Sequence, residues 1–213
     1  MATYKKGILG VFTGKVGTVV GSSWKGISYM KSLPKSSGKA PSQPQIDQRL
    51  KFGLVTSFLK PIRTLTNIGY GLVSGNLTPY NAAVSYHLNN AVIGNSPNFE
   101  IDYPMVMFSR GELPGPAVPA MAANPGGALN FSWVDNATAN LAQPNDKAIV
   151  LVFHVATKEF VHSDTAKRSA GSLEMTLPTH FVGGAVHAWM AFFNANDKQV
   201  STSVYLGEET VVA

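Results

Sequence analysis

The residues that could do chemistry concentrate in one stretch near the start of the chain, residues 14–35. This stretch, GKVGTVVGSSWKGISYMKSLPK, combines glycines, lysines, a tryptophan and a tyrosine, and it contains no acidic residue. Lysines can neutralise phosphates and aromatic rings can stack on bases, so the composition suits a nucleic-acid contact. The candidate contact residues are Lys15, Trp24, Lys25, Tyr29, Lys31, Lys35 and Lys39. In the alternative interpretation the lysines are merely solvated and the rings anchor a small β-structure, and for Trp24 this is preferred.

The Gly14-Lys15 pair invites comparison with a phosphate-binding loop, but its neighbours do not fit. That motif requires a glycine five residues before Gly14 and a serine or threonine after the lysine. Leu9 and Val16 occupy these two positions. A glycine-rich docking ribbon explains the stretch better than a nucleotide site, and we predict no cofactor.

The pattern of the remaining polar residues predicts neither a catalytic site nor a metal site. The histidines show neither HxH nor HExxH spacing, and they are His87, His154, His162, His180 and His187. His154 and His187 could be cross-strand neighbours, but two imidazoles without a carboxylate make a weak metal site. No G-x-S-x-G turn marks a nucleophile, and the absence of cysteine removes thiolate chemistry. We therefore expect a protein that is not an enzyme and has no catalytic or metal-binding residue.

Two further groups of residues keep minor alternatives open. Asp102 and Glu112 lie near Arg110 in the sequence and indicate ion pairs rather than a pair of catalytic acids. A carbohydrate site could use aromatic residues of the last strands, although packing is their preferred role. These residues are Trp189, Phe193 and Tyr205.

The net charge of +5 conceals a division along the chain. Residues 1–70 hold eleven basic residues and one acidic residue, whereas residues 71–213 hold six basic and eleven acidic residues. A basic head on a mildly acidic body indicates either a polyanion partner or contact between the head and the body of neighbouring copies. The charged fraction of 14% is low, and a surface poor in charge favours an assembled state.

Periodicity predicts a ribbon, then helices, then strands. Residues 7–33 alternate like a β-ribbon with a turn at 21–23, and Ser42 and Thr78-Pro79 are typical of helix starts. Residues 100–109 predict one strand within an extended connector. Seven further strand-like runs are separated by turn residues, which is typical of an antiparallel sandwich. They are residues 118–121, 128–133, 148–155, 159–162, 172–177, 185–194 and 200–206.

We therefore predict an α+β fold that is mainly β, with three parts. Residues 1–95 form a basic ribbon plus a helical domain, residues 96–115 form an extended connector, and residues 116–213 form the sandwich. No apolar run is long enough to span a membrane, and the start of the chain makes a poor signal peptide. We expect cytoplasmic synthesis without export and no membrane partner.

Two resemblances support this outline. The segments LNFSW, SLEMTLP and VHAWMAFF make residues 116–211 similar to a fibronectin type III or immunoglobulin-like module. The whole chain resembles a bacterial family of about this length that is known only as a domain of unknown function. The matching segments are GKVGTVVGSSWKGISYMKSLP, QRLKF, FLKPIRTLTNIGY, NAAVSYHLNNAV, IDYPMVMFSRGELPG and SVYLG. The resemblance implies one conserved arrangement and carries over no activity.

The preferred function is structural. We expect a self-associating subunit of a phage-like particle, tail or filament that displays its sandwich outward, with copies of itself as partners. The alternative is a nucleic-acid-binding protein that uses the basic residues 1–70.

Overall fold

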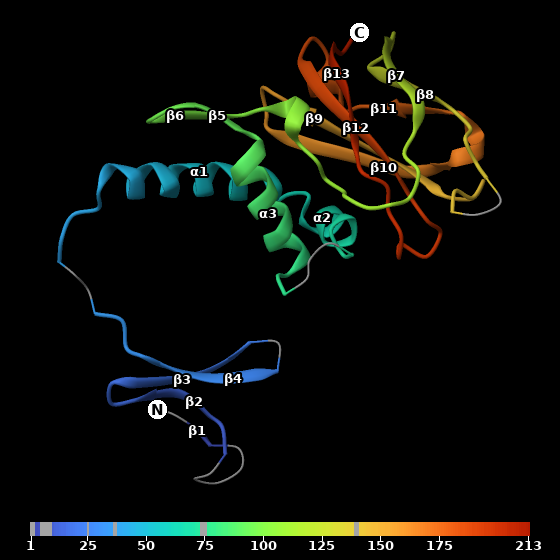
Figure 1. Ribbon diagram of the computed structural model, residues 1–213. Helices are drawn as coiled ribbons and strands as arrows, with labels where there is room; N and C mark the ends of the chain where they lie inside the picture. The colour runs from blue at the N-terminus through green and yellow to red at the C-terminus, as the bar shows by residue number, and fades with distance from the viewer. Residues whose placement is uncertain (1–2, 5–9, 25, 36–37, 73–75, 139–140) are drawn as a thin grey trace. The chain divides into compact units, whose positions relative to one another are not determined.

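The computed structural model describes residues 3–4, 10–24, 26–35, 38–72, 76–138 and 141–213. These residues form two compact units, Met1–Ser42 and Gln43–Ala213, and Figure 1 labels the helices and strands of each. The first unit is a small antiparallel sheet, and the second combines helices with a β-sandwich. The expected fold class, α+β and mainly β with an antiparallel sandwich, is confirmed.

The first unit, called here the ribbon unit, contains four strands in the order β1-β2-β3-β4. They are β1 (Thr3–Tyr4), β2 (Phe12–Val16), β3 (Val19–Trp24) and β4 (Ile27–Ser32). The turn expected at residues 21–23 is wrong, because these residues lie inside β3 and pair with both neighbouring strands. The chain instead reverses near Gly17 and Gly26, whose positive φ angles of 57° and 82° favour glycine.

Gly21 shows why glycine is needed inside a strand of this ribbon. It pairs with Gly14 of β2, and a Cβ atom at Gly21 would lie 2.2 Å from the carbonyl oxygen of Phe12. Gly21 is also the one buried residue among the positions of this unit whose burial is described. The ribbon unit therefore has almost no core of its own.

The second unit begins with three helices, α1 (Gln43–Leu59), α2 (Arg63–Gly69) and α3 (Pro79–Asn90). The predicted start of α3 is confirmed: the Thr78 hydroxyl accepts a hydrogen bond from the Asn81 amide at 3.2 Å, and Pro79 is the first helical residue. Helix α1 buries only its last turns. Ile46 and Leu50, nearer its start, are 38% and 41% exposed.

The strands of the second unit form a hairpin and a sandwich. The hairpin pairs β5 (Val92–Asn95) with β6 (Asn98–Ile101). One sheet of the sandwich has the order β10-β9-β12-β13 and the other β11-β8-β7. The sandwich strands are β7 (Ala117–Asn124), β8 (Ala128–Val134), β9 (Lys147–His154), β10 (Glu159–Lys167), β11 (Ser172–Thr176), β12 (Ala185–Phe193) and β13 (Val204–Thr210). This pairing of a three-stranded with a four-stranded antiparallel sheet matches the expected module.

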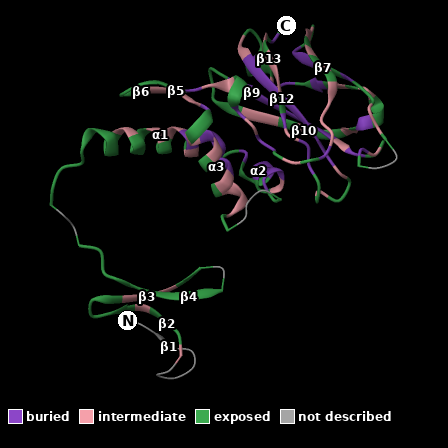
Figure 2. Ribbon diagram, viewed as in Figure 1, coloured by how far each residue is buried: buried purple, intermediate pink, exposed green. Residues whose placement is uncertain are grey.

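The central strands of the four-stranded sheet, β9 and β12, are buried on both faces, as their colouring in Figure 2 shows. Its inner side chains, such as Val150 and Met190, pack against the three-stranded sheet. Its outer side chains, such as Leu151 and Trp189, share a core with Leu59 and the other helical residues. Burial on both faces explains why β9 and β12 are continuously apolar instead of alternating.

This packing changes the division of the chain. The expected boundaries near residues 95 and 115 differ from the observed division at Ser42, because the helices share one core with the sandwich. The strand expected at residues 100–109 is also wrong: β6 ends at Ile101, and Tyr103–Met105 forms a short 3-10 helix, η1, that contains Pro104. The last strand begins at Val204 rather than at residue 200.

Candidate functional site

The strand register sorts the side chains of the ribbon unit onto two faces, since directly paired residues of an antiparallel sheet lie on the same face. Lys15 pairs with Val20, and Val20 pairs with Lys31, so two lysines flank one valine in a row across three strands. Trp24 pairs with Ile27 on the same face. The charged face is defined by Lys15, Val20, Ser22, Trp24, Ile27, Tyr29 and Lys31.

The aromatic rings of the charged face are accessible. Trp24 is 50% exposed and Tyr29 is 43% exposed. Tyr29 pairs with Ser22, two residues along β3 from Trp24, so the two aromatic residues are diagonal neighbours roughly 7–8 Å apart. The interpretation of Trp24 as a core anchor is therefore wrong in this structure, because a two-faced ribbon without a second layer offers no core to enter.

Among the described residues of β2, β3 and β4, none on the opposite face of the ribbon is charged. This uncharged face is defined by Phe12, Gly14, Val16, Val19, Gly21, Ser23, Ser28, Met30 and Ser32. Met30 is 70% exposed, and a hollow of about 270 Å³ lies beside it, with Phe12 and Ser28 in its lining. An exposed apolar side chain beside a hollow is suited to a protein partner.

Four of the seven predicted contact residues come together, two do not, and the position of one is not described. Lys15, Trp24, Tyr29 and Lys31 share the charged face. Lys35 and Lys39 follow the end of β4 and are exposed, but they are not part of the sheet. Lys25 lies outside the described residues.

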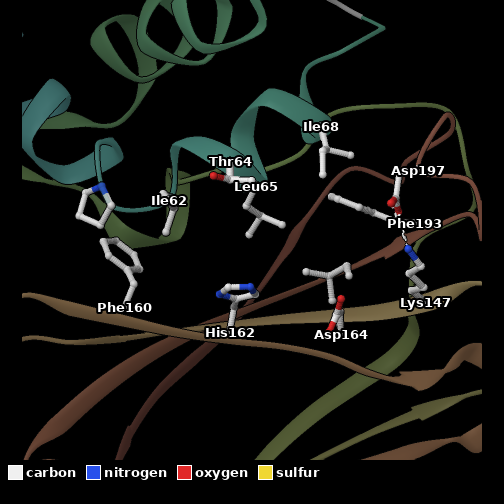
Figure 3. Close-up of a pocket in the computed structure, with 12 residues that line it drawn as sticks. Ile62, Thr64, Leu65, Ile68, Lys147, Phe160, His162, Asp164, Phe193 and Asp197 are labelled. Carbon is white, nitrogen blue, oxygen red and sulfur yellow. Dashed lines mark hydrogen bonds and ion pairs between the residues drawn. The ribbon is translucent and has the colours of Figure 1, made fainter.

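Sequence reasoning missed a hollow of about 400 Å³ between α2 and the outer face of the four-stranded sheet. Figure 3 shows Leu65 and Ile68 facing His162 and Asp164, with Lys147 and Asp197 at one end. The ammonium of Lys147 lies 3.0 Å from both carboxylate oxygens of Asp197. The apolar side comes from α2, and the polar side comes from alternate residues of β10. That alternation along β10 was the one feature of the sequence that could have indicated this hollow.

A second hollow, of about 530 Å³, lies between α1, β6 and the edge of the four-stranded sheet. Its lining is mainly apolar and includes five aromatic rings, of which those of Phe58 and Phe160 meet edge-to-face at 5.1 Å. Glu100 and Lys158 contribute opposite charges. Because the two charges balance, the lining does not favour a cationic or an anionic ligand.

One hydrogen-bond chain at the end of the sandwich resembles a catalytic arrangement but differs in order. The Thr157 hydroxyl donates to Glu159 at 3.1 Å and lies 2.8 Å from Nδ1 of His154. In a hydrolase triad the histidine stands between the hydroxyl and the carboxylate, whereas here the hydroxyl stands in the middle. Glu159 also pairs with His180 at 2.6 Å, and this pairing lowers the pKa of Glu159. These hydrogen bonds tie a turn together, and no histidine stands between the hydroxyl and the carboxylate.

The remaining histidines have structural surroundings. His154 pairs with Val186, so His154 and His187 lie on neighbouring strands but on opposite faces, and they form no joint site. His187 is buried, stacks on Tyr103 at 4.0 Å and contacts the Tyr205 hydroxyl at 2.8 Å. Burial lowers the pKa of His187. In the described ranges no cluster of three or more His, Asp or Glu side chains could hold a metal ion.

The aromatic residues weighed for a carbohydrate site pack inside the protein or beside its core. Trp189 and Phe193 are buried, and Tyr205 is partly buried against the core beneath the helices. Arg110 does not form the expected ion pair with Asp102 or Glu112. Its guanidinium lies over the ring of Tyr86, 5.8 Å from the centroid.

The fold and the surfaces define a fibronectin III-like sandwich with a helical layer, preceded by a basic β-ribbon. The profile of a family of unknown function, DUF6266, matches residues 11–207, and the chain belongs to this family. The match spans both units, as the resemblance of the whole chain implied. No curated protein matches the chain.

Two solved structures are distantly similar to part of the chain. The fn3 domain of human collagen alpha-1(XX) chain is 10% identical, with a TM-score of 0.35, and the match covers 47% of this chain and 87% of that one. The chicken CNTN1 FN1-FN3 domains are 9% identical, with a TM-score of 0.36, and the match covers 48% of this chain and 33% of that one. Likenesses this distant carry no argument about function. Among the described helices, none has the length and apolar character needed to cross a membrane.

Proposed function

We propose that this protein is a non-catalytic structural protein that self-associates through its ribbon unit. The observation that carries the proposal is the lack of a core in that unit, where Gly21 is the one buried residue at the positions whose burial is described. An isolated sheet this small is marginally stable in water, so a partner surface would supply the missing burial. The assembled state would be a phage-like particle, tail or filament with the sandwich displayed outward.

The uncharged face is the better candidate for the contact between copies. Residues 1–42 contain seven lysines and no acidic residue, so contact through the charged face would bring like charges together. The uncharged face buries apolar groups without this cost.

Two substitutions on β4 test the proposal with a matched control. Met30 and Ile27 are 70% and 71% exposed, lie on the same strand and point to opposite faces. Met30→Ser should weaken self-association by about 10- to 100-fold, because a buried methionine contributes about 1.5–3 kcal/mol. Ile27→Ser should leave self-association unchanged.

The measurement is the molar mass of the full chain by size-exclusion chromatography with light scattering, over a range of concentrations, followed by negative-stain microscopy. A wild-type chain that stays monomeric at micromolar concentration and at any salt concentration would overturn the proposal. If the wild type assembles but Met30→Ser has no effect, the assigned face is wrong.

A second candidate function is nucleic-acid binding by the charged face. The register that gathers Lys15, Trp24, Tyr29 and Lys31 on one face favours it. Because the two functions use opposite faces of the ribbon, one protein could perform both.

A further inference from the structure

We infer that the charged face binds single-stranded nucleic acid by stacking bases on Trp24 and Tyr29, with Lys15 and Lys31 against the phosphates. This inference rests on the second candidate function and names its ligand. Three properties of the face carry it: the row of lysines, the pair of exposed rings and the lack of acidic residues.

The lysines form an electrostatic site whose geometry follows from the register. Lys15 and Lys31 lie on either side of Val20, two strand spacings apart, which places their backbones roughly 10 Å from each other. No carboxylate in residues 1–42 opposes them. Two cations at this separation can contact successive backbone phosphates, and such contacts supply affinity without regard to sequence.

The rings decide between single-stranded and double-stranded ligands. The flat surface of a base is accessible in a single strand but is covered by its neighbours in a duplex. Trp24 and Tyr29 present two accessible rings as diagonal neighbours, beside the lysine row. A ribbon reading the major groove would instead need side chains that hydrogen-bond to base edges, and the tryptophan of this face is poorly suited to that role.

The intrinsic fluorescence of Trp24 can be used to follow ligand binding at the charged face. The other two tryptophans, Trp133 and Trp189, are 5% and 0% exposed, so a fluorescence change on adding an oligonucleotide reports on Trp24. We expect dT oligonucleotides to quench this fluorescence and to bind more tightly than a duplex of equal length at low salt.

Substitutions in the full chain separate stacking from charge and from general apolar contact. Trp24→Leu should weaken dT binding by roughly 5- to 100-fold, and Trp24→Phe should restore most of it, because stacking requires a ring. Leu72→Ser removes an exposed apolar side chain of the second unit, which is not part of the charged face, and should have little effect. K15Q/K31Q should lower the slope of log affinity against log salt by about 1.4, whereas the equally charged change K60Q/K198Q on the second unit should not.

Each outcome bears on the inference. Binding of dT that depends on the ring of Trp24 supports it. If a duplex binds as tightly as dT and Trp24→Leu does not change its affinity, nucleic-acid binding is supported but the single-strand assignment is overturned. No binding of either ligand at low salt overturns both, while the assembly test on Met30 is unaffected.

Discussion

His87 and Met107 join the helical layer to the segment that leads into the sandwich. The buried imidazole of His87 accepts a hydrogen bond at Nε2 from the backbone N–H of Met107, at 3.3 Å. Its Nδ1 donates to the carbonyl oxygen of Ala83, one turn earlier in α3, at 2.7 Å. The bond at Nε2 requires a neutral ring, because a protonated ring has no acceptor nitrogen, and burial lowers the pKa of His87 to about 4.

The stability of the second unit should therefore fall in mild acid. In the unfolded chain the pKa of His87 returns to about 6.5, so between pH 6.5 and pH 4 the unfolded state binds a proton that the folded state rejects. The contribution of His87 is fully present above pH 6.5 and is lost as the pH falls to 4, at a total of about 3 kcal/mol. Urea unfolding at pH 7 and pH 4.5 measures it.

His87→Gln should flatten this dependence, although it lowers stability at pH 7. The control is His162→Gln, since His162 is exposed on β10. An unchanged slope in His87→Gln would assign the acid sensitivity to other groups.

Breaking the buried ion pair of the sandwich should be strongly destabilising. Arg168 and Asp146 are 0% and 1% exposed and are joined at 3.1 Å, and the guanidinium also lies 3.8 Å from the centroid of the Phe192 ring. Asp146→Asn leaves the guanidinium buried without its counter-charge, so we expect a loss of about 3–5 kcal/mol in the free energy of unfolding. Asp197→Asn, at the partly exposed pair with Lys147, should cost about 1 kcal/mol or less. Similar losses of unfolding free energy in both variants would contradict the expected difference between the buried and the partly exposed ion pair.

Two helical glycines should respond to alanine in opposite directions. Gly53 lies inside α1 with no atom within 4 Å of the added Cβ, so Gly53→Ala should stabilise the chain by about 0.5–1 kcal/mol. At Gly69 the Cβ would lie 2.3 Å from the carbonyl oxygen of Phe108, so Gly69→Ala should destabilise. Thermal unfolding measures whether each variant has a higher or lower melting temperature than the wild type. Equal changes in melting temperature would mean that the surrounding chain moves readily to accept the added Cβ at Gly69.

The helices and the sandwich should unfold together. Leu59 is fully buried in the core that α1 shares with the outer face of the four-stranded sheet. Leu59→Ala should cost about 2–5 kcal/mol and should accelerate hydrogen exchange even in β8 and β11 of the other sheet. Leu72→Ala, at a largely exposed position, should cost less than about 0.5 kcal/mol. If β8 keeps its protection in Leu59→Ala, the helices form a separate cooperative unit.

Local patterns in the sequence were enough for the types of most elements. Thr78 followed by Pro79 predicted the start of α3, because capping depends only on adjacent residues. Alternation predicted β8, where Leu129 and Phe131 point into the sandwich core. The turn after Gly21 was misplaced because glycine is common both in turns and where another backbone group approaches closely, as the Phe12 carbonyl does here.

The sequence by itself determined the basic, acid-free character of the ribbon and the identity of the residues that could contact a polyanion. Only the tertiary structure decided which of them lie together, because Lys15 and Lys31 share a face through strand pairing, which residue spacing does not report. It also decided that the helices belong with the sandwich, since continuous apolar strands such as β9 do not reveal what covers each face. Pairing and packing join residues that are distant in the chain, so they lie beyond any local pattern.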